Sequence, residues 1–289
     1  MDERREKYIN LFTDYGFKRV FGSEMNKDLL IDFLNELLKG KEKKIVDLTY
    51  LPSEQISRTE IDRKAIYDLY CKNEAGERFI VELQKAKQKF FKDRSIYYST
   101  FPIQHQAKKG EWNYELKAVY TVGILDFIFN DEEKKPDDIK EEHTENTEDE
   151  VVTIAKIIDE KTGKVFYDKL TYVYLEIPKF DKKLENITTH FEKWLYVFKY
   201  LHRLQKRPLE LQEAIFNKLF ETAEISKFTH EEYEAYETSL KAHRDYKNTI
   251  DFAKEEGFEQ GIVKGIEQGI EQEKMNSEKK LNEEKINIA

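Results

Sequence analysis

Residues 66–84 read IYDLYC-KNEAGER-FIVELQ, two short apolar runs on either side of a polar turn. Each run carries an acidic residue where an ordinary strand would carry a hydrophobic one. Because side chains alternate along a strand, one face of this hairpin should carry Ile66, Asp68 and Tyr70 from the first run and Ile80, Glu82 and Gln84 from the second. This stretch therefore predicts a β-hairpin that carries acids on one face.

The turn of the hairpin predicts the strand register. A three-residue loop that ends at a left-handed Gly76 pairs Asn73 with Glu77 and sets Asp68 directly opposite Glu82. Opposed residues of an antiparallel pair have Cβ atoms roughly 5 Å apart, and like charges there are destabilising. We therefore expect a cation between the two carboxylates, and Mg²⁺, Mn²⁺ or Ca²⁺ suits oxygen ligands.

The composition is typical of a folded protein without disulfides. Hydrophobic residues make up 39% of the 289 residues, enough for a sizeable core, and the single cysteine suits a reducing compartment. The first ten residues are charged where a secretory signal would be apolar, and no apolar run has the length of a membrane span. We expect a cytoplasmic protein with no membrane partner.

The net charge of −9 argues against a nucleic-acid partner only if it is spread evenly. Residues 131–150 hold eleven acids and three lysines, a net charge of −8, which leaves −1 for the remainder of the chain. We interpret residues 131–150 as an acidic surface insertion or disordered loop. DNA remains a candidate partner, because binding follows the local charge.

The charge changes sign directly after the hairpin, where seven basic residues accompany one acid between residues 84 and 110. Aromatic residues at helical spacing predict a helix from about residue 86 to 105. The basic residues just before this helix and in its first half are Lys85, Lys87, Lys89, Lys92 and Arg94. This helix is either a DNA-contacting surface, for which interleaved aromatic and basic residues are typical, or a lysine-rich solvated helix.

The remaining sequence predicts an α/β core from residue 1 to 180, a helical region from 181 to 256 and a tail from 257 to 289. A helix is expected over 25–39, and Asp14, Lys18 and Arg19 before it are expected to face water. Strands are expected at 45–51, within 112–129, and two or three times between 151 and 180. Helices are expected near 189–205, 208–221 and 229–256.

The tail repeats every four residues, with glycine at 257, 261, 265 and 269 and an apolar residue after each. In a helix this repeat would form a drifting apolar ridge, but each glycine costs up to about 1 kcal/mol. The tail is either a low-complexity segment or a marginal helix that orders on self-association, which would make a homo-oligomer.

An opposed Asp–Glu pair that holds a divalent cation is suited to phosphodiester hydrolysis, because the cation polarises a phosphoryl oxygen and activates water. Gln84 shares the face of Glu82 and could contact the same water. Lys85 should point to the opposite face while the strand is regular.

Asp68, followed after thirteen residues by Glu82-Leu83-Gln84, resembles the PD-(D/E)XK nuclease superfamily in its E-x-Q variant. An ordered set of segments resembles the Rpn recombination-promoting nucleases, which are also called PD-(D/E)XK-family putative transposases. These segments are TDYGFKRVFG (13–22), NKDLLIDFLNELL (26–38), YDLYCKNEAGERFIVELQ (67–84), YYST (97–100), VGILDF (122–127) and LEIPKF (175–180), together with the glycine-rich tail.

The resemblance implies a restriction-endonuclease-like α/β core and a bacterial, metal-dependent DNA endonuclease linked to recombination or mobile elements. It places Asp68 and Glu82 on the metal-binding acids and Gln84 on a position that is lysine in most of the superfamily. Tyr67 stands where the superfamily name has proline. Superfamily members often carry a further acid on the first helix, for which Glu24 and Asp28 are candidates.

Three alternatives remain open from the sequence. The two acids could lie on a solvated hairpin face, or a close carboxylate pair could serve a retaining glycosidase, which nothing else in the sequence supports. The strongest alternative is a catalytically weak or inactive nuclease-like protein that binds DNA or assembles through its helical C-terminal part.

Overall fold

The computed structural model describes residues 6–40, 43–55, 65–107, 110–129 and 148–287. It divides into two compact units, Met1–Lys241 and Ala242–Ala289. Most of the predicted acidic insertion, residues 130–147, lies outside the described residues. Within the described ranges, no helix combines the length and apolar character that a membrane span requires.

The first unit contains a mixed six-stranded sheet with the strand order β1-β4-β5-β6-β8-β7. Its strands are β1 Leu48–Tyr50, β4 Leu69–Asn73, β5 Arg78–Gln84, β6 Val119–Leu125, β7 Val152–Ile158 and β8 Val165–Glu176. β5, β6 and β8 run parallel to one another, while β1, β4 and β7 form antiparallel pairs at the two sides. A separate two-stranded sheet pairs β2 Glu54–Gln55 with β3 Ala65–Ile66. The predicted α/β class is confirmed.

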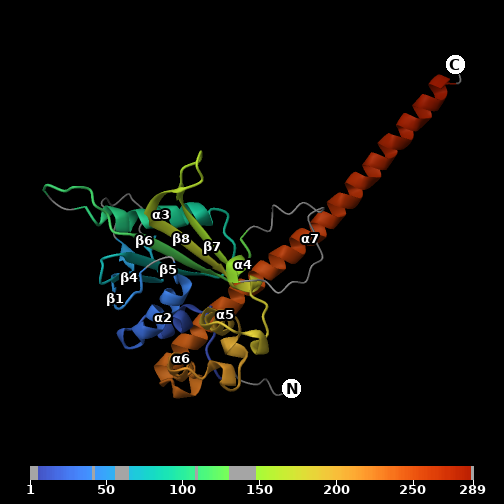
Figure 1. Cartoon of the computed structure of the whole chain (residues 1–289). Coiled ribbons are helices and arrows are strands. Elements are labelled where there is room, and N and C mark those ends of the chain that lie inside the picture. The colour runs from blue at the N-terminus through green and yellow to red at the C-terminus, as the bar shows by residue number, and fades with distance from the viewer. Residues whose placement is uncertain (1–5, 41–42, 56–64, 108–109, 130–147, 288–289) are drawn as a thin grey trace. The chain divides into compact units, whose positions relative to one another are not determined.

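Helices cover both faces of this sheet (Figure 1). The α-helices are α1 Asp14–Phe21, α2 Lys27–Leu37, α3 Phe91–Gln104, α4 Glu148–Val151, α5 His190–Tyr200, α6 Ala214–Ala223 and α7 His230–Asn287. Short 3-10 helices are η1 Glu24–Asn26, η3 Ile177–Lys179, η4 Leu184–Asn186, η5 Leu201–Arg203, η6 Leu209–Leu211 and η7 Ile225–Lys227. The segment predicted as a low-complexity or weakly helical tail is helical through residue 287.

The central hairpin has the expected turn and register. Gly76 has φ 81°, and the Asn73 N–H donates to the Glu77 carbonyl at 3.0 Å. The β4–β5 register, continued by one pair, sets Asp68 opposite Glu82. The first run is not one regular strand, however, because the chain bends at Asp68 and the segment before it pairs with β2 instead. Ile66 is consequently 62% exposed rather than on the packed face.

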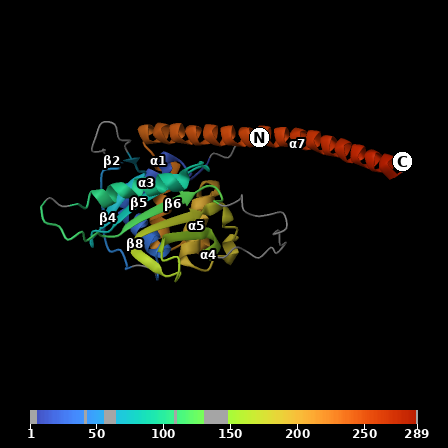
Figure 2. The same ribbon diagram turned by 90° about the horizontal axis from the view of Figure 1, so that it is seen from above.

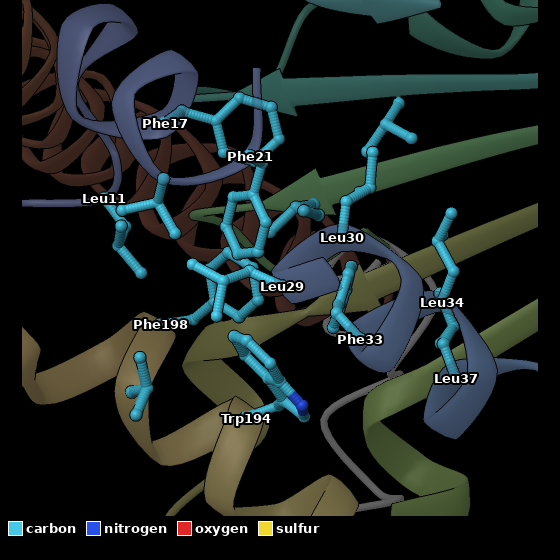
Figure 3. Packing of buried hydrophobic residues seen from close by; sticks show 14 of the residues in the cluster. Leu11, Phe17, Phe21, Leu29, Leu30, Phe33, Leu34, Leu37, Trp194 and Phe198 are labelled. Atoms are coloured by element: carbon cyan, nitrogen blue, oxygen red, sulfur yellow. The ribbon is translucent and has the colours of Figure 1, made fainter. Parts of the chain in front are cut away.

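The face of the sheet away from the acids carries the main hydrophobic core. Side chains of α1, α2 and α5 meet there, as Figure 3 shows for Phe21, Phe33, Trp194 and Phe198. The rings of Phe21 and Phe198 stack with centroids 5.6 Å apart. Burial of these large side chains is the main stabilising contribution, about 1.5–3 kcal/mol for each. The helical segment after residue 181 thus packs into the same core as the preceding segment, within one compact unit.

Helix α3 covers the opposite face of the sheet (Figures 1 and 2). It connects the parallel strands β5 and β6 and continues through Pro102 to Gln104. A proline cannot donate to the carbonyl four residues earlier, which here belongs to Tyr98. The Tyr67 hydroxyl donates to this carbonyl at 2.9 Å and replaces the missing bond. Tyr67 therefore holds α3 against the hairpin.

Candidate active site

The candidate site lies on the α3 side of the hairpin, where the Asp68 bend faces the end of β5. The Leu83 N–H donates to Asp68 Oδ2 at 2.6 Å, which fixes one carboxylate oxygen. Burial raises the pKa of Asp68, while this hydrogen bond opposes the rise. The bend thus directs the Asp68 side chain along β5 toward the residues that follow Glu82.

Glu82 occupies the adjacent position in a desolvated environment. Its Oε1 atom is buried and has no hydrogen-bond partner among the described residues. Burial, followed by the nearby Asp68 charge, raises the pKa of Glu82 to about 8. A buried carboxylate oxygen without a partner is costly, since it has lost its hydration. The Glu82 carboxylate is therefore stabilised in this environment by a proton or by a bound cation.

The neighbouring strand β6 presents no side chain at the position beside Glu82. In the parallel β5–β6 pair, Gly123 lies beside Glu82, and Tyr174 of β8 lies beside Gly123. A Cβ atom at Gly123 would approach Tyr174 Cδ1 to 2.9 Å, closer than a real contact allows. Glycine at position 123 lets the Tyr174 ring pack across β6.

Helix α1, which the sequence pattern did not predict, brings a third acid and a lysine to this region. The Thr13 hydroxyl caps the helix by accepting from the Gly16 N–H at 3.0 Å, and a Cβ atom at Gly16 would lie 2.3 Å from the Asn10 carbonyl oxygen. Asp14 and Lys18 form an ion pair of 2.8 Å, and both interact electrostatically with Asp68. Their spacing of four residues was the available sequence signal.

Lys85 lies near these acids rather than away from them. β5 ends at Gln84, so the alternation of the strand no longer fixes the direction of the next side chain. Burial lowers the pKa of Lys85, while Asp14 and Asp68 favour its charged form. Gln84 carries no positive charge, but Lys85, one residue later, brings one near the acids.

Gln84 is buried and its amide is bonded within the protein. Its Nε2 donates to the Ala86 carbonyl at 2.9 Å, and its Oε1 accepts from Arg94 Nη2. Arg94 also donates to Gln88 at 2.7 Å, and its charge favours the ionised form of Glu82. Gln84 thus holds a guanidinium beside the acids, although Arg94 was expected on a DNA-contacting face.

The other predicted site residues lie elsewhere. Glu24 is near Lys27 at 3.5 Å, and Asp28 pairs with Lys218 at 2.6 Å. Neither appears among the charges that act on Asp68 or Glu82. Three exposed lysines lie at the start of α3 or before it: Lys87, Lys89 and Lys92.

The donor set is suited to a hard divalent cation. Asp68 and Glu82 supply carboxylate oxygens, the ligands that Mg²⁺ and Mn²⁺ favour, and Glu82 Oε1 has no other partner among the described residues. In the described part of the chain, no cluster of three or more His, Cys, Asp or Glu residues is placed to hold a metal ion. The pair would therefore hold an ion together with water or substrate oxygens.

The mixed sheet and the opposed Asp and Glu define an α/β protein of the nuclease type. A family model described as PD-(D/E)XK nuclease family transposase matches residues 11–253, and the chain belongs to this family. No curated protein and no solved structure matches the chain. The family links the chain to nucleases and transposition.

Proposed function

We propose that this protein is a divalent-metal-dependent DNA endonuclease that hydrolyses phosphodiester bonds during transposition or recombination. The observation that carries the proposal is the buried Glu82 Oε1 opposite Asp68, which has no hydrogen-bond partner in the described part of the chain, since such a pair is stabilised by a bound cation. DNA is the proposed substrate because the chain belongs to a nuclease family.

Asp68 and Glu82 would hold the ion, and Mg²⁺ or Mn²⁺ would supply polarisation of a phosphoryl oxygen and a more acidic water. The Leu83 N–H orients Asp68 and leaves its second oxygen available. Asp14 is our candidate for the first-helix acid, because its charge acts on Asp68 and Lys85, whereas Asp28 is paired with Lys218.

The positive charge beside the reacting phosphate would come from Lys85 and Arg94. Lys85 interacts with Asp68, and Arg94 interacts with Glu82. Gln84 acts as a positioning residue, since its carbonyl oxygen accepts from Arg94. This arrangement would stabilise the charge that develops on phosphate oxygens during hydrolysis.

The test is plasmid nicking by the full chain with Mg²⁺, Mn²⁺ or EDTA. We expect nicking that needs a divalent ion and falls by roughly 100-fold or more in Asp68→Asn and Glu82→Gln. Asp14→Asn should reduce it by about 10–100-fold, whereas Asp28→Asn should not. Asp47→Asn, at an exposed carboxylate paired with Lys27 at 2.7 Å, is the matched control.

Equal nicking by the wild type and both acid variants from the same preparation would identify a contaminating nuclease and contradict the proposal. A larger loss in Asp28→Asn than in Asp14→Asn would reassign the first-helix acid.

A non-catalytic role in DNA binding or assembly is the second candidate, because the amide of Gln84 is already bonded to Ala86 and Arg94. DNA binding without cleavage in any divalent ion would favour this role.

A further inference from the structure

A pocket of about 470 Å³ lies beside the candidate site, at the start of α3. Its walls include Gln88, Lys89, Phe90, Asp93, Arg94 and Tyr97. The volume is within the range of small-molecule sites, about 300–1,000 Å³. Of these residues, only Arg94 also belongs to the candidate active site.

Two aromatic rings of the pocket remain in contact with water. Phe90 is 65% exposed and Tyr97 is 41% exposed, whereas Phe91 between them is buried in the sheet interface. Phe90 is the N-cap residue of α3 and Tyr97 lies within the helix, and both line the same pocket. Exposed rings in this arrangement provide flat apolar surface that an aromatic ligand can cover.

The polar groups of the pocket suit a nucleobase attached to phosphates. Asp93 is exposed and can accept from an exocyclic amine, while Lys89 supplies a positive charge. Lys89 Nζ lies 5.5 Å from the Phe90 ring centroid, so the charge and the stacking surface are adjacent. A base with its phosphate would contact both.

Arg94 connects this pocket to the acids. Its guanidinium donates to Gln88 at 2.7 Å and to Gln84, and it lies 5.8 Å from the Tyr98 ring centroid. These contacts hold the side chain in one position between the pocket and Glu82. A nucleotide in the pocket would therefore place its neighbouring phosphate near the carboxylates.

We propose that the pocket binds an unpaired nucleobase of the DNA strand, stacked on Phe90 and Tyr97, next to the phosphate that the acids act on; this deepens the proposed function and rests on it. An unpaired base is required because the faces of a base within a duplex are covered by its neighbours. The protein would consequently prefer DNA with a single-stranded segment at the reacting site.

The experiment measures binding of the full chain to three fluorescent DNAs in EDTA, so that no cleavage occurs: a single strand, a duplex with a short gap and a fully paired duplex. We expect tighter binding to the first two. Phe90→Ala and Tyr97→Ala should each weaken that binding by about fivefold or more. Their binding to the paired duplex should remain within twofold or so.

Two control variants separate stacking from general effects. Tyr97→Phe keeps the ring and should bind like the wild type, and Phe166→Ala removes an aromatic side chain that is 76% exposed outside the pocket. Circular dichroism spectra verify folding. A 2-aminopurine placed at the unpaired position should lose fluorescence on binding to the wild type and keep it with Tyr97→Ala.

Equal loss for single-stranded and paired DNA, or no loss in either alanine variant, would overturn the inference. Binding of a free mononucleotide as tight as that of the oligonucleotide would overturn it as well. Because the assay contains no metal, it is independent of cleavage. Suppose that nicking needs Asp68 and Glu82 while the pocket variants keep their affinity for single-stranded DNA. This result would refute base binding in the pocket and leave the proposed nuclease activity supported.

Discussion

Glu82 differs from the buried glutamates Glu176 and Glu192 in how its carboxylate is bonded. Glu176 accepts from the Phe129 N–H at 2.6 Å and from Lys179 at 2.8 Å. Glu192 accepts from the Thr188 N–H at 2.7 Å. Both of these acids are satisfied by the protein itself, as buried polar groups normally are. An oxygen without a partner among the residues that the structure describes therefore distinguishes Glu82 from these two acids.

Glu82→Gln should stabilise the metal-free protein, because it removes one of two opposed carboxylates. We expect a gain of about 1 kcal/mol in the free energy of unfolding in EDTA, measured by urea denaturation. Mg²⁺ should raise the melting temperature of the wild type and not that of this variant, since a ligand stabilises only the state that binds it. Loss of stability in EDTA together with an unchanged Mg²⁺ effect would contradict the ion site.

The opposition of Asp68 and Glu82 could be predicted from sequence because it depends on local chemistry. A glycine at the left-handed turn position fixes the strand register, and the alternation of side chains along each strand places both acids on the same face. The positions of Asp14 and Lys85 could not be predicted in this way. Asp14 reaches the site through the packing of α1, and Lys85 does so because β5 ends one residue before it. Such long-range packing leaves no local periodicity in the sequence.

Helix α3 presents different residues to the sheet, the site and water. Arg94 is bonded to Gln84 at the site, whereas Lys87, Lys89 and Lys92 are exposed. The sequence grouped all of these as one basic surface, because charge counts do not record direction. The exposed lysines could contact DNA phosphates, whereas Arg94 is bonded to Gln84 next to the acids.

Changing Lys87, Lys89 and Lys92 together to glutamine should weaken DNA binding and reduce its salt dependence. Each lost phosphate contact lowers the slope of log affinity against log salt by about 0.9 on duplex DNA. The measurement is fluorescence anisotropy over a series of salt concentrations in EDTA. Lys161→Gln, at an exposed lysine in the β7–β8 turn, is the control. An unchanged slope in the triple variant would show that these lysines do not contact phosphates.

In the second unit, α7 is continuous through Asn287 and carries an exposed apolar ridge. Phe258, Ile262, Ile266 and Ile270 are 70%, 48%, 58% and 51% exposed, and each follows a glycine. A four-residue repeat advances about 40° for each step around an α-helix, so the ridge winds slowly. This ridge supports the hypothesis that the helix associates with a second copy of itself.

We expect the full chain to self-associate through this ridge. Deletion after Glu256 should then abolish the association, and so should Ile262→Gln combined with Ile266→Gln. The substitutions remove apolar area at two ridge positions while they keep the helix length. Molecular mass is measured by light scattering over a range of concentrations. An assembly that persists in both variants would exclude the ridge as its interface.

On the scale of the whole molecule, the hydrophobic core joins segments that the sequence pattern assigned to different regions. Phe21 and Phe33 precede the sheet in the chain, yet they contact Trp194 and Phe198 of α5. Local patterns predicted α2 and α5 but not α1, and they could not reveal that the helices before and after the sheet cover the same face. The compact unit consequently includes the helices that follow the sheet, up to Lys241.

One polar network within this unit should make its stability depend on pH. His190 of α5 lies 2.7 Å from Asp32 of α2 and 2.9 Å from Glu213, the residue before α6. The hydrogen bond with Asp32 raises the pKa of His190 above its usual value, and burial opposes the rise. Two further charges act on the same network: Glu36, which also favours the imidazolium, and Lys193, which pairs with Glu213.

Because the folded protein binds this proton more tightly than the unfolded chain, the stabilisation is fully present below the unfolded pKa of about 6.5. It is lost as the pH rises through the raised pKa of the folded state. His190→Gln should therefore cost about 1 kcal/mol more at pH 6 than at pH 9, measured by urea denaturation. Phe166→Ala, at a 76% exposed side chain without a titratable group, is the control for the two pH values. An equal cost of His190→Gln at both pH values would mean that the network holds the helices together without the imidazolium charge.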